Sequence, residues 1–261
     1  KYHCDFCVPH SGGLRLVKLD QALTLVKKAR EGAKLPFGLK PTILFRDDNI
    51  YSNPEYAKKL FAGLMPLRLN WTANSSIDIA FDDEALKLAK ASGCKSLFIG
   101  FETIYPQRLQ KTSTGHMRST DDYTRAIKNI KSRGIKITGA FILGFDYYTH
   151  KDYLRLIWFL IRSGLYSVSL TILTPFPASQ LFERLKKENR ITTFDWRKYD
   201  SLHHVVFRPK HMSAMSLSLW FIITRIVGLL ASPYFIITML QALACYYLAF
   251  YFVNIIKGRL F

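Results

Sequence analysis

Strand-like and helix-like segments alternate along the chain up to about residue 190, and this alternation constrains the fold more than any other feature. Runs rich in Ile, Leu, Val and Phe predict strands over residues 42–46, 67–73, 96–101, 135–143 and 167–173. Amphipathic stretches predict helices near residues 20–31, 54–64, 82–92, 120–133, 150–163 and 179–188. Regular alternation of this kind is typical of a parallel α/β sheet or barrel.

Local signals mark where these helices begin and end. Asn53-Pro54 and Asp82-Asp83-Glu84 are typical of helix N-termini, where side-chain oxygens cap free N–H groups. Ser92-Gly93, Arg133-Gly134 and Ser163-Gly164 each close a predicted helix just before a predicted strand. The boundaries therefore agree with the hydrophobic pattern.

The pattern changes after residue 190. Residues 191–225 are expected to form an extension on the substrate side, and residues 226–261 a hydrophobic helical tail. Residues 226–256 contain no Asp, Glu, Lys or Arg, and the run 233–256 is long enough to cross a bilayer. We expect this tail to contact a membrane; the alternative is a helix that packs on the barrel.

The composition is strongly basic, with 37 Lys and Arg against 19 Asp and Glu and a formal net charge of +18. Such an excess attracts anionic partners, of which acidic lipid headgroups are one class. An ordinary solvated basic surface remains an equal alternative. No nucleic-acid-binding motif accompanies the charge, so no nucleic-acid partner is expected. The 4 cysteines are too few for a disulfide framework and indicate a reducing compartment.

Cys4 and Cys7 form a C-x2-C pair at the start of the sequence. A C-x3-C-x2-C motif would need a further cysteine just ahead of Lys1, and its three thiolates would hold three irons of a [4Fe–4S] cluster. A C-x2-C pair can equally be half of a zinc site on a basic α/β binding module, with His10 as the next ligand. The fourth zinc ligand would then be His3, His203, His204 or His211.

Polar and glycine residues follow three of the predicted strands. Chemistry in parallel α/β folds collects at the carboxyl ends of strands, so these positions are candidates for a site. A carboxylate after an apolar strand is costly unless it is solvated or paired, and it suits the recognition of an amine or a ribose hydroxyl. Glycines there let the backbone approach a ligand closely. The candidate residues are Asp47, Asp48, Asn49, Gly100, Glu102, Gly139 and Gly144.

With these segments in this order, the chain resembles the cobalamin-dependent branch of the radical S-adenosylmethionine (radical SAM) enzymes. The resemblance covers residues 1 to about 215. Within that branch, the chain most resembles the subgroup of hopanoid methylases and Mg-protoporphyrin ester cyclase-like proteins. Besides the C-x2-C pair, it rests on FRDDNI (45–50), NPEYA (53–57), SGCK (92–95), FIGFE (98–102), GAFILGFD (139–146), ILTPFP (172–177) and VVFRPKHMS (205–213).

The resemblance implies a partial (β/α)6 TIM-type barrel over residues 1–190, with its first strand and first cluster cysteine upstream of Lys1. Cys4 and Cys7 would be the second and third ligands of the cluster, and Phe6 would lie beside the nucleotide of S-adenosylmethionine. Glu102, after Gly100, would contact the ribose or amino group of that cofactor. Gly139 to Gly144 would form the wall against its adenine, and residues 47–49 would line the barrel mouth.

The activity that the resemblance implies is radical methyl transfer. A 5′-deoxyadenosyl radical would take hydrogen from an unactivated carbon of a lipid-like or polycyclic substrate, and methylcobalamin would donate the methyl group. Cyclisation by a related radical enzyme is the alternative reaction. Flavodoxin or ferredoxin would supply electrons, in the cytoplasm or at the inner membrane. Cobalamin would be bound by a domain ahead of the barrel, and this segment by itself would be inactive.

Overall fold

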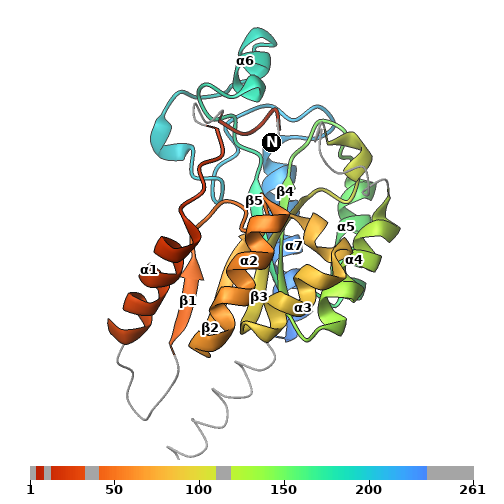
Figure 1. Ribbon diagram of the computed structural model, residues 1–261. Coiled ribbons are helices and arrows are strands. Elements are labelled where there is room, and N and C mark those ends of the chain that lie inside the picture. The colour runs from red at the N-terminus through yellow and green to blue at the C-terminus, as the bar shows by residue number, and fades with distance from the viewer. Residues whose placement is uncertain (1–3, 9–12, 33–40, 110–118, 234–261) are drawn as a thin grey trace, which may run out of the picture.

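A computed structural model describes residues 4–8, 13–32, 41–109 and 119–233 of the chain. It contains a five-stranded sheet in which neighbours in the sequence are also neighbours in space, and every pair is parallel (Figure 1). The predicted parallel α/β fold is therefore confirmed. The strands are β1 (Thr42–Phe45), β2 (Asn70–Ser75), β3 (Cys94–Glu102), β4 (Lys136–Leu143) and β5 (Ser167–Ile172).

Helices connect the strands as parallel pairing requires. The connecting helices are α2 (Pro54–Leu64), α3 (Asp83–Ala91), α4 (Thr120–Ser132) and α5 (His150–Ser163); α1 (Leu19–Gly32) precedes β1, and α6 (Gln180–Lys187) and α7 (Ala214–Leu230) follow β5. The expected caps are present: the Asn53 side chain accepts from the N–H of Tyr56, and the Asp82 side chain accepts from that of Ala85. The six predicted helices match α1–α6 to within a residue or two at each end.

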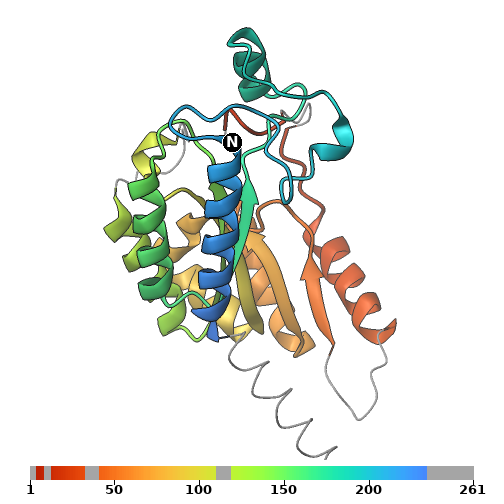
Figure 2. The same cartoon turned by 180° about the vertical axis from the view of Figure 1, so that it is seen from behind.

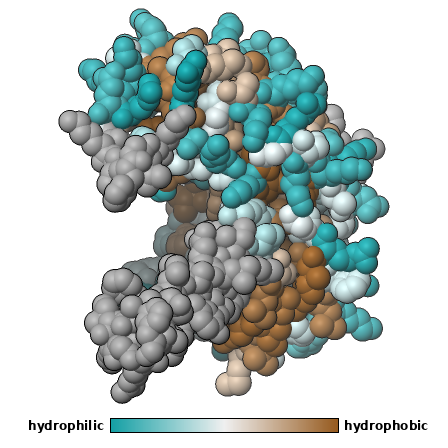
Figure 3. All heavy atoms as spheres, turned by 90° about the horizontal axis from the view of Figure 1, so that it is seen from below, coloured by the Kyte–Doolittle hydropathy of each residue, from teal (hydrophilic) through white to brown (hydrophobic). Residues whose placement is uncertain are grey.

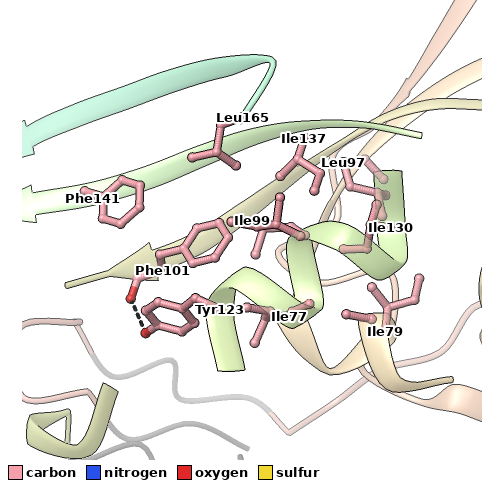
Figure 4. Close-up of a cluster of buried hydrophobic side chains, with 14 of the residues drawn as sticks. Ile77, Ile79, Leu97, Ile99, Phe101, Tyr123, Ile130, Ile137, Phe141 and Leu165 are labelled. Carbon is pink, nitrogen blue, oxygen red and sulfur yellow. Dashed lines mark hydrogen bonds between the residues drawn. The ribbon is translucent and has the colours of Figure 1, made fainter. Parts of the chain in front are cut away.

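The sheet has one buried face and one partly exposed face. On the buried face, Ile99, Phe101, Ile137 and Phe141 pack against the helical layer that includes α4 (Figure 4). There the Tyr123 hydroxyl donates to the Phe101 carbonyl over 3.0 Å, and burial raises the pKa of this tyrosine well above its usual value. On the other face, residues such as Leu44 and Phe98 remain exposed. Alternation along each strand separates the two faces.

The C-terminal part of the described chain contains a helix that the pattern analysis missed. α7 packs on β5 and α5, and it crosses the boundary expected between residues 225 and 226 (Figure 2). None of the helices in the described ranges is long and apolar enough to cross a membrane. The first residues of the predicted tail, 226–230, form the end of α7. Apart from Pro233, the run 233–256 that was predicted to be long enough to cross a bilayer lies outside the described residues.

Gly93 offers a direct test of the fold. Its φ is +101°, and a Cβ there would collide with the carbonyl oxygen of Leu69. We expect Gly93→Ala to lower the free energy of unfolding by at least about 2 kcal/mol, because strain and a backbone clash add. Gly32→Ala is the control, since no atom lies within 4 Å of its added Cβ; it should change stability by less than about 1 kcal/mol. Urea unfolding followed by circular dichroism measures both, and equal stabilities would contradict the register of β2 and β3.

Candidate functional site

The loop that carries Cys4 and Cys7 lies at the carboxyl ends of the strands (Figure 1). Within it, the N–H of Cys7 donates to the carbonyl of Cys4 over 3.1 Å, which closes a tight turn and places both thiols on one short segment. Cys4 is half-buried and Cys7 is exposed. Two sulfur ligands at this spacing suit an iron–sulfur cluster or a zinc ion, and the site needs further ligands in either case.

Contacts with distant parts of the chain hold this loop in place. The carbonyl of Asp5 accepts from the backbone N–H of Leu181 in α6 over 2.8 Å. The Phe6 ring meets the Phe145 ring edge-on, with 5.7 Å between centroids. Phe6, predicted to lie beside a nucleotide, therefore packs on the segment that follows β4.

The loop forms one wall of a cavity of about 180 Å³. Its other walls come from the segments after β3, β4 and β5 and from α6. The cavity is lined by Cys4, Asp5, Phe6, Arg108, Leu109, Phe145, Asp146, Tyr147, Leu173, Leu181 and Arg184. Arg108 lies over the Tyr147 ring, 5.3 Å from its centroid. The cavity thus combines two arginines, an aromatic wall and one thiol of the C-x2-C pair.

An ion network centred on Asp146 forms part of the cavity wall. The Arg184 guanidinium lies 3.1 Å from Asp146 Oδ2 and 3.3 Å from Asp5 Oδ2, so it bridges the end of β4 and the cysteine loop. Arg190 also pairs with Asp146, and Lys210 Nζ lies 3.9 Å from the same carboxylate. Burial alone would raise the pKa of Asp146, but the Arg190 hydrogen bonds and the nearby cations outweigh burial and lower it.

Glu102 ends β3 in an unusual backbone conformation. Its φ is +66°, and the register with β4 shifts between Gly100 and Glu102, which indicates a β-bulge. A Cβ at Gly100 would collide with Glu102 Oε1, so the glycine makes room for this carboxylate above the partly exposed face of the sheet. A non-glycine residue held at positive φ is costly and is often retained for function.

The two glycines of the β4 region have packing roles in the described structure. A Cβ at Gly139 would come within 2.7 Å of Leu165 Cδ1 on the buried face, beside Phe101 and Phe141. Gly144 has a φ of +112° and faces the α7 side chain of Leu217. Neither residue lines the cavity beside the cysteine loop.

Residues 47–49 lie at the end of β1, at the opposite edge of the sheet from β5. Asn49 Oδ1 accepts from the N–H groups of Tyr51 (3.0 Å) and Ser76 (2.9 Å), so it ties the ends of β1 and β2 together. Asp47 and Asp48 are exposed, and none of the three residues lines the cysteine-loop cavity.

The histidines proposed as zinc ligands lie in other surroundings. His203 and His204 each place Nδ1 near Asp200 Oδ2, at 3.1 and 2.9 Å. Within the described ranges, no three His, Cys, Asp or Glu side chains gather closely enough to hold a metal ion. His3 and His10 lie outside those ranges.

Sequence reasoning did not identify the basic residues of the site. Arg108, Arg184 and Arg190 carry no local signal of a site, because the cavity residues that they contact, Tyr147 and Asp146, lie far away in the chain. Arg184, for example, reaches Asp5 across 179 residues. The local signal that could have found them is Asp146, an acidic residue three positions after the end of β4 that needs a cation or solvent nearby.

Comparison with known proteins finds a matching family model and similar proteins. A family model described as the radical SAM superfamily matches residues 1–160. The bacteriochlorophyllide d C-12(1)-methyltransferase of Chlorobaculum tepidum is 32% identical over 219 residues, which cover 82% of this chain and 46% of that protein. The hopanoid C-2 methylase of Rhodopseudomonas palustris is 26% identical, over 76% of this chain and 38% of that protein. The chain thus spans about half the length of these relatives or less.

Solved structures share the fold. The radical S-adenosylmethionine methyltransferase TsrM from Kitasatospora setae, solved with cobalamin and a [4Fe–4S] cluster, matches with a TM-score of 0.61 and 18% identity; the match covers 72% of this chain and 37% of that one. The cobalamin-dependent radical enzyme OxsB matches with a TM-score of 0.56 and 18% identity, over 74% of this chain and 35% of that one. At this identity the likeness is one of fold.

Asp146 gives a pH test of the ion network. Because its pKa is lowered in the folded state, its contribution to stability is present above the usual Asp pKa and is lost as pH falls through the folded value. We expect Asp146→Asn to cost roughly 1.5–3 kcal/mol at neutral pH, as for other hydrogen bonds to charged groups. The difference from the unchanged protein should shrink below about pH 4. Urea unfolding across a pH series measures this, with the exposed Glu31→Gln as control; a difference that persists undiminished in acid would contradict the assignment.

Proposed function

We infer the function of this chain from its family: it belongs to the radical SAM superfamily, whose model matches residues 1–160. We propose that the chain is the barrel domain of a radical SAM methyltransferase that acts on an unactivated carbon. The carrying observation is the C-x2-C loop anchored over a cavity at the carboxyl ends of the strands. The methyltransferase and methylase relatives support the reaction class. Radical cyclisation is the second candidate reaction.

Cys4 and Cys7 would hold two irons of a [4Fe–4S] cluster, with the third ligand ahead of Lys1. The residues fit such a group, because two thiols on one tight turn lie beside a cavity with Arg108 and Arg184 in its walls. Cationic walls favour thiolates over thiols and balance the negative charge of a thiolate-bound cluster. When bound, the cluster and S-adenosylmethionine supply a 5′-deoxyadenosyl radical, and cobalamin on a preceding domain supplies the methyl group.

The other residues of the chain would bind and orient the cofactors. The Glu102 carboxylate, placed above the partly exposed sheet face, would accept hydrogen bonds from the ammonium or ribose hydroxyls of S-adenosylmethionine. Phe6, fixed by Phe145, would cover the nucleotide and exclude water from it. Gly139 would act indirectly, since its missing side chain lets Phe101 and Phe141 approach each other below the site. Gly144 would set the turn that brings Phe145 to Phe6.

The substrate would lie over the partly exposed face of the sheet, within a partial (β/α)6 barrel whose first strand precedes residue 1. Leu44 and Phe98 leave apolar surface on that face, which suits a polycyclic or lipid-like molecule. Asp47 and Asp48 would stand at the rim near β1. A flavodoxin or ferredoxin would supply the electrons in a reducing compartment, where thiolate ligands persist.

The cysteine variants test the cluster. The gene product, expressed from its own start codon, is reconstituted anaerobically with iron and sulfide, and the EPR spectrum of the reduced cluster is recorded with and without S-adenosylmethionine. Cys4→Ala and Cys7→Ala should lose the [4Fe–4S] signal. Cys94→Ala should keep it, because Cys94 is buried at the start of β3, at the opposite end of the strand from the cysteine loop. Binding of zinc in place of iron would support the zinc-module alternative and overturn the proposal.

Gly100→Ala tests the role of Glu102. The added methyl group would push the Glu102 carboxylate out of its place, so S-adenosylmethionine should bind about tenfold more weakly while the cluster EPR signal without it stays unchanged. Glu102→Gln, which keeps the shape and removes the charge, should weaken binding in the same direction. Equilibrium dialysis measures both, with Gly32→Ala as control. Unchanged affinity in both variants would exclude Glu102 from cofactor binding.

A further inference from the structure

α7 is apolar on two opposite sides. Its buried side packs Leu217, Phe221 and Gly228 against the rest of the protein. Its opposite side consists of large apolar side chains, each 48–82% exposed. These are Met215, Leu219, Ile222, Ile226, Leu229 and Leu230. A helix that is hydrophobic all round is normally covered on all sides, and no described residue covers this side of α7.

The neighbouring helix α5 extends the exposed apolar surface. Leu154, Trp158 and Ile161 recur at helical spacing and are 48–60% exposed. α5 packs beside α7 (Figure 2), and hydrophobic side chains gather in one area over α7 in the view from below (Figure 3). We call these nine side chains of α5 and α7 the α5–α7 apolar surface. A groove of about 380 Å³ lies beside it at the end of β5, lined by apolar side chains of α7 and β5 together with Leu202, His203, Ser218 and Arg225.

The charges around this surface are almost all positive. The sequence from residue 201 to residue 261 contains no Asp or Glu. On α7 the charged residue is Arg225, and on α5 the outward-facing cations are Lys151, Arg155 and Arg162. The one acid of α5, Asp152, is buried and pairs with Arg155. The Arg162 guanidinium covers the exposed Trp158 ring, 5.2 Å from its centroid.

We propose that the α5–α7 apolar surface docks on an anionic lipid bilayer, with α7 lying along the interface. A bilayer with acidic headgroups supplies both an apolar layer for the leucines and isoleucines and negative charge for the surrounding arginines. An exposed Trp with an adjacent Arg is typical of the level of the headgroups. A second copy of the chain fits less well, because a symmetric contact would bring the same cations together. The proposal does not depend on the radical chemistry.

The experiment measures co-flotation of the full chain with phosphatidylcholine vesicles, with and without added phosphatidylglycerol. The unchanged protein should float with the anionic vesicles, more weakly as salt is raised, and little with the neutral ones. The double variant Leu219→Glu/Ile226→Glu should bind the anionic vesicles at least about tenfold more weakly, because two anchors become charged. Leu25→Glu, at a 62% exposed position of α1, is the matched control and should bind as the unchanged protein does.

Three results would overturn the proposal. If the double variant bound the anionic vesicles as tightly as the unchanged protein, the membrane contact would lie elsewhere in the chain. If the unchanged protein failed to float with the anionic vesicles, docking on an anionic bilayer would be excluded. Loss of a dimer in the double variant, seen by size-exclusion chromatography with light scattering, would make a second copy the occupant. Circular dichroism checks that each variant is folded. If Leu219→Glu/Ile226→Glu unfolds, Leu219→Ser/Ile226→Ser is used in its place.

Discussion

Parallel pairing of the five strands is the constraint on which the site depends. In each pair the strands run in the same direction, so all five carboxyl ends arrive at one edge of the sheet. Glu102 at the end of β3, Asp146 after β4 and Leu173 after β5 are thereby collected from distant parts of the sequence. The helical returns between the strands leave this edge free for loops. The cysteine loop rests on the part of the edge formed by β4 and β5.

The buried face of the sheet and the site above it are linked through single residues. Gly139 allows Phe101 and Phe141 to stack with 5.2 Å between their centroids. Phe101 lies directly before Glu102, so its close packing fixes the strand at the point where the bulge turns the carboxylate toward the other face. Bulges of this kind re-aim a side chain at the cost of a local break in the ladder. The position of Glu102 is thus determined by core packing as well as by its own backbone.

The sequence predicted those features that depend on neighbours in the chain. Caps such as Asn53 and Asp82, glycines after helices, and runs of apolar residues located the strands and helices to within a few residues. α7 was missed because its two apolar sides erase the periodicity by which an amphipathic helix is detected. The expected roles of Gly139 and Gly144 at a ligand could not be separated from packing roles. In a sequence, a glycine that makes room for a ligand cannot be told from one that makes room for a neighbouring side chain. Arg184 and Arg190 were missed because only the fold brings Asp146 to them.

The cysteine loop shows why such long-range contacts matter to the chemistry proposed for it. The Cys7 N–H donates to the Cys4 carbonyl within residues 4–8, and a turn of this kind does not by itself hold a short loop in one conformation against its chain entropy. The Leu181 N–H, the Arg184 guanidinium and the Phe145 ring each add a contact from a rigid element. Arg184 is itself held by Asp146, which Arg190 and Lys210 keep ionised. The geometry of the two thiols therefore depends on charged residues in the cavity wall and on the cations behind them, as the proposed role of the thiols as cluster ligands requires.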